Sequence, residues 1–295
     1  MRVAVAGLGL MGSAIAERLI AAGHAVGVYN RTPGKAAALV DLGGVELTDR
    51  AHVWDSADVA ITMVADSTAL EAITVAEGGL VSDAARGKTL IDMSTVSAEA
   101  SARVAAAAAD TGLAFLRAPV SGNPVAVRAG NLGIMVSGDP DEFAAAEPLL
   151  RDIGPNIFYL GDGEASRIMK LAVNLMVAGT AQLLAEALTL GEAHGLDRAA
   201  MLEVISGSAV GSPFVRYKSG PLVAEDYSST FTTRLMAKDL DLALTSAAQA
   251  GVPLPTTALV RQLVQGCISS GMADIDFMAL LPRLQREAGR EAVSA

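Results

Sequence analysis

A lysine and an asparagine stand four residues apart in a long apolar stretch of the chain. Lys170 and Asn174 share one face of any helix formed there, because residues four apart are neighbours on a helix surface. Most residues around them are apolar, which indicates substantial burial. A lysine in a desolvated pocket has a lowered pKa and can exchange a proton near neutral pH. On spacing alone, a lysine that extends its ammonium from an apolar helix into solvent remains the alternative.

Three glycines interrupt the apolar start of the chain. They lie in the segment GLGLMG, between a predicted strand over 3–6 and a predicted helix over 13–22. In that setting they permit a tight turn, a close approach of the backbone to a pyrophosphate, and close packing of helix and strand. The N-terminus of the helix adds free N–H groups and partial positive charge. The pattern predicts a dinucleotide-binding loop. Its predicted contacts are Gly7, Leu8, Gly9, Leu10, Met11 and Gly12.

The next predicted strand, over 25–29, ends in Asn30-Arg31-Thr32 and not in an acidic residue. An NAD site usually has Asp or Glu there, which binds the ribose 2′-hydroxyl. Loss of the carboxylate removes its repulsion of a 2′-phosphate, and an arginine can bind that phosphate with two donors. We therefore predict a preference for NADP over NAD, with Asn30, Arg31 and Thr32 as contacts. A solvated surface arginine is the alternative.

Two further segments place small polar residues after predicted strands. Ser94 and Thr95 follow the strand TLIDM, and Ser121, Gly122 and Asn123 follow the strand AFLR. Ligands of open α/β sheets bind at the carboxyl ends of the strands, so both segments are candidates for cofactor or substrate contacts. For the first segment, capping of the next helix is an equal alternative. The second either presents N–H groups and a hydroxyl to an anion or only turns the chain.

The order of strands and helices around these residues predicts the fold. Apolar, β-branched runs occur at 3–6, 25–29, 59–64, 89–93, 114–116, 132–136 and 157–160, and helical stretches separate most of them, at 13–22, 33–42, 97–111 and 140–151. This alternation predicts a mostly parallel sheet with helices on both faces. One helical stretch then runs over 164–194 and ends at a glycine. Only helices follow, at 197–205, 233–250, 255–270 and 277–289, with Pro282 expected to kink or restart the last.

These elements predict an α/β protein with two domains. We expect a Rossmann-type dinucleotide-binding domain over 1–162 and an all-helical substrate and oligomerisation domain over 163–295, with the long helix 164–194 joining them. Because the first strand begins at Arg2, no signal peptide is expected.

Composition restricts the class of function. The chain has 295 residues and a formal charge of −10, which argues against a broad basic surface for nucleic acid. Cys267 is the only cysteine, and the three histidines lack metal-ligand spacing, so neither disulfide nor metal is expected and a cytoplasmic location is the default. The longest uncharged apolar run, 171–185, is too short and too polar to span a bilayer. We expect no membrane partner.

Four segments together resemble one enzyme family. GLGLMG, DMST, APVSGN and the GDG…K…N segment occur in the order and spacing of the β-hydroxyacid dehydrogenases, and KDLDLAL over 238–244 matches a later segment of that family. The family includes 3-hydroxyisobutyrate dehydrogenase and tartronate, glyoxylate and succinic semialdehyde reductases, and the resemblance covers essentially the whole chain. It implies an NADP-dependent oxidoreductase that acts on a short β-hydroxy acid or its semialdehyde. It also implies a homodimer or homotetramer packed through the helical domain.

The resemblance also implies roles for individual residues. Lys170 would exchange a proton with the substrate oxygen, and Asn174 would orient the substrate beside it. Asp239 would help to hold the segment that carries Lys238 in place. The implied contacts to a small carboxylate substrate are Ser94, Ser121, Gly122, Asn123 and Asn174. Further implied cofactor contacts are Met63, Val64, Thr95 and Lys238.

Two positions depart from the family pattern. The family commonly shows Asp-Ala-Pro-Val-Ser-Gly-Gly, whereas this chain has Arg117 and Asn123 at the first and last positions. Asn123 adds a side chain where bare backbone usually faces the substrate, which leaves the substrate open. Related imine reductases usually have Asp or Tyr in place of the lysine, so Lys170 favours carbonyl and alcohol chemistry. The alternatives kept are an imine or non-acid carbonyl reductase on the same scaffold, and a non-catalytic protein that binds NADPH.

Overall fold

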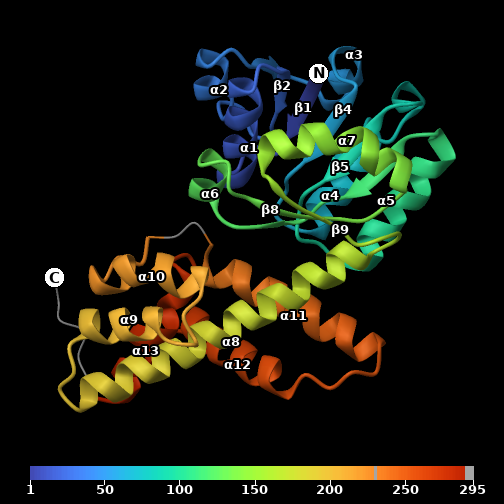
Figure 1. The fold of residues 1–295 in the computed structure, drawn as a ribbon. Coiled ribbons are helices and arrows are strands. Elements are labelled where there is room, and N and C mark those ends of the chain that lie inside the picture. The colour runs from blue at the N-terminus through green and yellow to red at the C-terminus, as the bar shows by residue number, and fades with distance from the viewer. Residues whose placement is uncertain (229–230, 290–295) are drawn as a thin grey trace. The chain divides into compact units, whose positions relative to one another are not determined.

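The computed structural model describes residues 1–228 and 231–289. The chain divides into two compact units, Met1–Lys170 and a second that begins at Leu171 (Figure 1). This division falls inside helix α8 (Ala165–Ala193), whereas the sequence predicted a boundary between 162 and 163. The last residues of the predicted helical domain, 290–295, lie outside the described part of the chain.

A six-stranded parallel sheet forms the centre of the first unit. Its strands are β1 (Arg2–Ala6), β2 (Ala25–Tyr29), β3 (Val45–Leu47), β4 (Val59–Thr62), β5 (Thr89–Asp92) and β6 (Ala114–Arg117). Their order, β3-β2-β1-β4-β5-β6, confirms the predicted parallel sheet of a Rossmann-type domain. The order of the strands along the sheet changes direction between β1 and β4, although all six strands are parallel. Ala6 pairs with both Tyr29 and Thr62, and Thr62 pairs with Asp92, so the carboxyl ends lie along one edge. The edge strand β3 was not predicted because it has only three residues, one of them Glu46.

A second, smaller sheet was also not predicted. It consists of β7 (Val120–Ser121), β8 (Gly133–Val136) and β9 (Asn156–Tyr159), with β7 antiparallel to β8 and β8 parallel to β9. The sequence predicted one sheet for all the strands. A strand of two residues such as β7 is too short to show a periodicity. The sequence therefore gives no signal that β8 runs antiparallel to β7 in a separate sheet.

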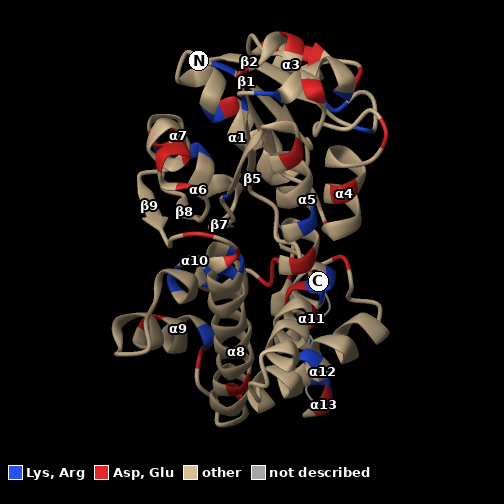
Figure 2. Ribbon diagram, turned by 90° about the vertical axis from the view of Figure 1, so that its right-hand side faces the viewer, with Lys and Arg blue, Asp and Glu red and all other residues tan. Residues whose placement is uncertain are grey.

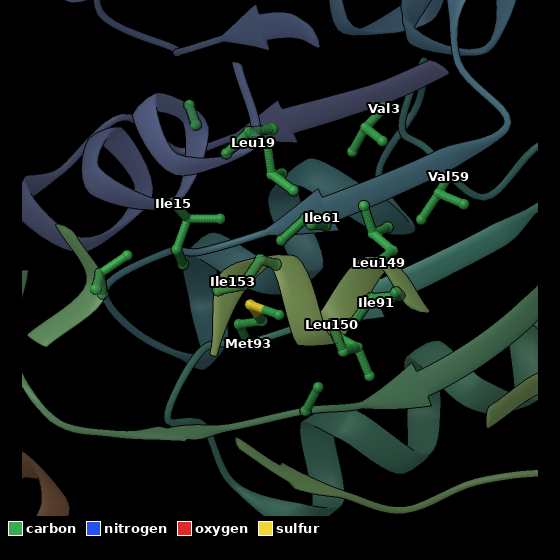
Figure 3. Packing of buried hydrophobic residues seen from close by; sticks show 14 of the residues in the cluster. Val3, Ile15, Leu19, Val59, Ile61, Ile91, Met93, Leu149, Leu150 and Ile153 are labelled. Carbon is green, nitrogen blue, oxygen red and sulfur yellow. The ribbon is translucent and has the colours of Figure 1, made fainter. Parts of the chain in front are cut away.

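Helices cover both faces of the large sheet. They are α1 (Leu10–Ala21), α2 (Ala37–Asp41), α3 (Val53–Ser56), α4 (Ser67–Thr74), α5 (Ala98–Thr111), α6 (Pro124–Arg128) and α7 (Pro140–Ile153). Alternate residues of β1 belong to different core clusters: Val3 and Val5 face one, Ala4 and Ala6 the other. On the first face, Ile61 and Ile91 pack with Ile153 of α7 (Figure 3). Burial on both faces explains the near-continuous apolar strands.

The second unit is helical. After α8 it contains α9 (Arg198–Gly207), α10 (Pro213–Val223), α11 (Thr233–Gln249), α12 (Pro255–Ser269) and α13 (Leu280–Glu287). Helix α10 was not predicted because Pro213 and Pro221 indicate breaks; they lie instead at its first position and in its last turn. The last helix restarts at Leu280 after a 3₁₀ turn, which places Pro282 in its first turn, where the missing N–H has no cost.

Helix α8 has 29 residues and a mean hydropathy of 1.5 in its most apolar window. By length and composition alone it is the one helix in the described chain that could cross a membrane, whereas the sequence run 171–185 predicts a segment too short and too polar to do so. In the structure 39% of that window is buried, and residues such as Ala178, Ala181 and Leu188 belong to the core of the second unit. One side of α8 therefore packs in the core of the second unit.

Candidate functional site

The glycine loop joins β1 to α1 at the carboxyl edge of the large sheet. Gly7 has a φ of +103°, and its N–H donates to the carbonyl of Tyr29 at 2.9 Å. A Cβ on Gly7 would lie 2.3 Å from the carbonyl oxygen of Met63, and one on Gly12 would lie 1.9 Å from that of Gly7. A Cβ on Gly9 would meet no atom within 4 Å. The outer glycines therefore serve packing, and the middle one leaves open the backbone surface that a dinucleotide requires.

The start of α1 also fits an anionic ligand. Among the residues that the structure describes, no side chain caps the helix at Gly9, so its first N–H groups keep their partial positive charge toward solvent. Leu8 is buried and Met11 packs against the core, whereas Leu10 is exposed. These residues therefore fit a bound dinucleotide phosphate, with the backbone as donor.

Asn30 connects the glycine loop to the turn that follows β2. Its Oδ1 accepts a hydrogen bond from the N–H of Leu8, and its Nδ2 donates to the carbonyl of Thr32, both at 2.9 Å. An aspartate could make only the first of these bonds, because a carboxylate has no donor. The exposed Arg31 and Thr32 lie on the turn that this amide fixes. The bracing role of Asn30 was not predicted.

Asp92, the last residue of β5, is the centre of a buried polar network. Its Oδ1 accepts hydrogen bonds from the hydroxyls of Thr62 (2.6 Å) and Ser94 (2.7 Å). The Oγ of Ser94 accepts in turn from the N–H of Val64 at 2.9 Å, which ties the ends of β4 and β5 together. The hydroxyl proton of Ser94 is thus directed to Asp92, and contact with a substrate carboxylate would require it to leave that bond. Thr95 follows, half-buried.

Arg167, in the first turn of α8, supplies the opposite charge. It is 1% exposed, and its guanidinium donates to Asp92 Oδ2 (2.5 Å), to the carbonyl of Ser94 (2.6 Å) and to the hydroxyl of Ser101 (3.3 Å). Charge-assisted bonds of this kind are about twice as strong as neutral ones. Neither Asp92 nor Arg167 was singled out from the sequence. The available signals were a carboxylate at the end of a buried strand and an arginine three residues before Lys170.

A second ion pair continues from Arg167. Glu164 Oε1 accepts from Arg117 at 2.7 and 2.9 Å, and the Arg117 guanidinium lies 4.9 Å from the centre of the Phe115 ring. Glu164 Oε2 lies 4.0 Å from Arg167 Nε. Charges therefore alternate from Asp92 through Arg167 and Glu164 to Arg117, and they sum to zero. Arg117, which departs from the family pattern, has its counter-charge within this chain.

The loop after β6 carries three of the residues that the sequence predicts as substrate contacts. Ser121 is exposed in β7, and Gly122 has a φ of +141°, where an added Cβ would lie 2.9 Å from Leu132. Asn123 caps α6, because its Oδ1 accepts from the N–H of Ala126 at 2.9 Å. This contact satisfies a helix N-terminus and leaves the Nδ2 of Asn123 as a donor, so the substrate contact of Asn123 stays a prediction.

In the second unit a polar cluster joins α8 to α11. The Nδ2 of the buried Asn174 donates to Asp239 Oδ2 at 2.5 Å, and Lys238 Nζ lies 3.1 Å from Asp239 Oδ1. Asp239 is itself buried, so one carboxylate holds both side chains. Lys170 is half-buried and lies one helical turn before Asn174 on α8. The predicted residues thus form two groups, one at the strand ends of the first unit and one on α8 and α11.

Other titratable groups have structural partners. Within residues 1–228 and 231–289, no three His, Cys, Asp or Glu side chains are grouped as metal ligands. His24 bonds to Asp152 and His52 to Asp55, each at 2.9 Å. Burial raises the pKa of the Cys267 thiol, which keeps it protonated. Acidic and basic residues are intermixed in Figure 2.

Two family models match almost the whole chain. Residues 2–161 match the NAD-binding domain of 6-phosphogluconate dehydrogenase, and residues 163–284 match the NAD-binding model of NADP-dependent 3-hydroxyisobutyrate dehydrogenase. The chain belongs to the β-hydroxyacid dehydrogenase family. It is therefore an NAD(P)-dependent oxidoreductase that acts on CH–OH groups.

Individual relatives agree with this membership. The chain is 37% identical over 268 residues to 3-hydroxyisobutyrate dehydrogenase of Pseudomonas aeruginosa, which covers 88% of this chain and 90% of that protein. It is 32% identical over 286 residues to the chloroplastic glyoxylate/succinic semialdehyde reductase 2 of Arabidopsis thaliana. This alignment covers 97% of this chain and 80% of that protein. The solved structure of Psf3 in complex with NADP⁺ and 2-OPP matches this chain with a TM-score of 0.89 at 27% sequence identity. The match covers 96% of this chain and 99% of the Psf3 chain.

The glycine loop gives a first prediction. Gly12→Ala should lower the free energy of unfolding by about 1–3 kcal/mol, because its Cβ cannot fit beside the Gly7 carbonyl. Gly9→Ala should leave stability within about 0.5 kcal/mol but weaken NADPH binding about tenfold, since it fills only the ligand side. Urea unfolding and fluorescence titration with NADPH measure the two effects. Equal loss of stability in both variants would contradict the assignment.

Proposed function

We propose that this protein is an NADP-dependent reductase that interconverts a short β-hydroxy acid and its semialdehyde, with Lys170 as general acid and base. The observation that carries the proposal is the anchoring of Asn174 by Asp239, one helical turn after Lys170. The names of the relatives support the substrate class, because 3-hydroxyisobutyrate and succinic semialdehyde are both short carboxylates.

Lys170 supplies the proton chemistry in this proposal. When bound, the nicotinamide donates or accepts the hydride. A carbonyl carbon that gains hydride leaves negative charge on its oxygen, and a positioned acid stabilises that charge by proton transfer. The Lys170 ammonium gives its proton to this oxygen during reduction, and the neutral amine takes the proton back during oxidation. Because the Nδ2 of Asn174 is bound to Asp239, we assign Oδ1 of Asn174 to the substrate, as the acceptor that orients a hydroxyl.

The substrate carboxylate needs donors that the framework does not already use. Ser121 and Gly122 are exposed at the end of β7 and meet this requirement. The hydroxyl proton of Ser94 is engaged within the protein, whereas the cap by Asn123 uses only its Oδ1 acceptor and leaves Nδ2 as a donor. We therefore assign carboxylate binding to the Ser121-Gly122 segment with the Nδ2 of Asn123, and we give Ser94 the role of positioning neighbouring backbone.

A panel of substrates tests the function. Glyoxylate, succinic semialdehyde and 2-hydroxy-3-oxopropionate are each supplied with NADPH, as free acid and as methyl ester, and NADPH absorbance is followed. We expect turnover of at least one acid, and a KM about tenfold higher or more for its ester, which loses charge-assisted hydrogen bonds. Equal rates for acid and ester would favour a non-acid carbonyl reductase. Binding of NADPH without turnover of any panel compound would favour a non-catalytic protein.

Lys170 gives the second prediction. Lys170→Ala should lower kcat on the best panel acid by about 10²–10⁴-fold, the usual contribution of general acid catalysis. Lys170→Arg should not restore the rate, because a guanidinium does not release its proton. The Kd for NADPH is the control and should change little. An unchanged single-turnover rate of NADPH oxidation in Lys170→Ala would place the acid elsewhere.

Arg31 gives the third prediction, on cofactor choice. Arg31→Ala should reduce the ratio of NADH to NADPH dissociation constants about tenfold or more, because the lost phosphate contact is worth roughly 1.5–3 kcal/mol. The Kd for NADH should stay the same, since NADH lacks that phosphate. Fluorescence titration with both nucleotides measures the ratio. If the ratio is unchanged, Arg31 is only a surface residue.

The exposed face of α8 supports the assembly proposal, that two copies of the chain pack through their helical units. Met176, Leu183 and Leu190 are 69%, 67% and 64% exposed and are spaced seven residues apart, so they form one apolar stripe. Leu183→Glu should convert a dimer or tetramer into smaller species in light scattering at micromolar concentration. Val204→Glu on α9, which is 71% exposed, is the matched control. A monomeric wild-type protein would contradict the proposal.

A further inference from the structure

The start of α8 is fastened to the ends of three strands. Arg167 binds Asp92 and the carbonyl of Ser94 after β5. Glu164 binds Arg117 at the end of β6. Ser137, which follows β8, donates to the carbonyl of Gly163 at 2.7 Å, and its Oγ accepts from the N–H of Ser166 at 3.2 Å. The helix that carries Lys170 therefore begins on a rigid framework within the first unit.

A stable helix start does not by itself require these residues. The bond from the Ser166 N–H to Ser137 satisfies one of the first N–H groups, and Glu164 complements the positive end of the helix dipole. A buried arginine in the first turn has the opposite effect, because a cation is unfavourable there and its desolvation is costly. Arg167 is tolerated because Asp92 compensates its charge. The stability of the helix start therefore does not explain why an arginine is buried at this position.

We propose that Arg167, held by Asp92, is a positioning residue for Lys170. This inference rests on the proposed function. Lys170 lies three residues after Arg167, so the two side chains are neighbours on α8. A shift or rotation of the first helical turn would move both. The guanidinium thus fixes the proton donor relative to the end of β5.

The same network reaches the residues expected beside the cofactor. Asp92, which holds Arg167, also accepts from the hydroxyl of Ser94, and that hydroxyl oxygen holds the N–H of Val64. One chain of hydrogen bonds therefore connects the helical turn of Lys170 to the loop after β4. The distance between the proton donor and the expected cofactor neighbours is set by this chain. Misplacement of a reacting group by about 1 Å can cost about 10²-fold in rate.

The variant Arg167→Lys tests this role with little change of charge. A lysine ammonium can bind Asp92 or the Ser94 carbonyl, but it lacks the planar fork that binds both. The matched control is Arg198→Lys. Arg198 also binds carboxylate and carbonyl oxygens, those of Glu192 at 2.5 Å, Glu225 at 3.0 Å and the Leu222 carbonyl at 3.0 Å, but beside the opposite end of α8. The two variants make the same substitution near the two ends of α8, Arg167 within its first turn and Arg198 on α9 in contact with its last turn.

Amide hydrogen exchange of the free protein gives a readout that is independent of activity. Arg167→Lys should raise exchange in residues 166–171 and leave the C-terminal turn of α8 unchanged. Arg198→Lys should do the reverse. Equal exchange of residues 166–171 in wild type and Arg167→Lys would overturn the proposal, because the guanidinium would then not hold this turn.

A double-mutant cycle tests whether Arg167 acts through Lys170. The measured quantity is the single-turnover rate of NADPH oxidation with the panel acid of highest kcat/KM. Arg167→Lys should lower this rate about 10–100-fold with a less than threefold change in KM and in the Kd for NADPH, and Arg198→Lys should stay within twofold of wild type. In the Lys170→Ala background, Arg167→Lys should have less than a twofold effect.

The outcomes separate this inference from the proposed function. A wild-type rate in Arg167→Lys, or an equal rate loss in both backgrounds, would overturn the positioning role while Lys170 remains the acid. A wild-type rate in Lys170→Ala would overturn the proposed function, and the positioning role with it.

Discussion

The buried bond between Asp92 and Arg167 is the interaction on which the polar framework of the first unit depends. A single carboxylate accepts from Thr62, Ser94 and Arg167, so the ends of β4 and β5 and the first turn of α8 share one centre. Breaking a buried pair of this kind usually costs roughly 3–5 kcal/mol, because one charge remains without a partner. The helix cannot move away from the strand ends without that penalty.

A carboxylate also holds polar side chains in the second unit and at Arg117, the residue that departs from the family pattern. Asp239 holds the amide of Asn174 and the ammonium of Lys238, as Asp92 holds a guanidinium and two hydroxyls. Arg117 neutralises Glu164, which lies beside the positive Arg167. In each case a carboxylate, which has no donor of its own, fixes the position of the donor groups around it. Substitutions at these anchors are therefore expected to displace the neighbouring side chains.

The sequence predicted what depends on local pattern. The glycine loop, the parallel strands and the long helix follow from apolar periodicity and from glycine positions. The bond between Asp92 and Arg167 could not be predicted, because the two residues are 75 positions apart and pair only once the fold exists. The brace from Asn30 to Leu8 depends on the fold in the same way. The cap by Asn123 did have a local signal, since an asparagine followed by a proline is typical of a helix start.

The most direct measurement is a crystal structure of the protein with NADP⁺ and a short hydroxy acid bound. The account predicts Lys170 Nζ within hydrogen-bond distance of the substrate hydroxyl, the carboxylate on the Ser121-Gly122 segment, and Arg167 still on Asp92. A structure in which Arg167 leaves Asp92 to bind the substrate carboxylate, with Lys170 directed to solvent, would contradict it.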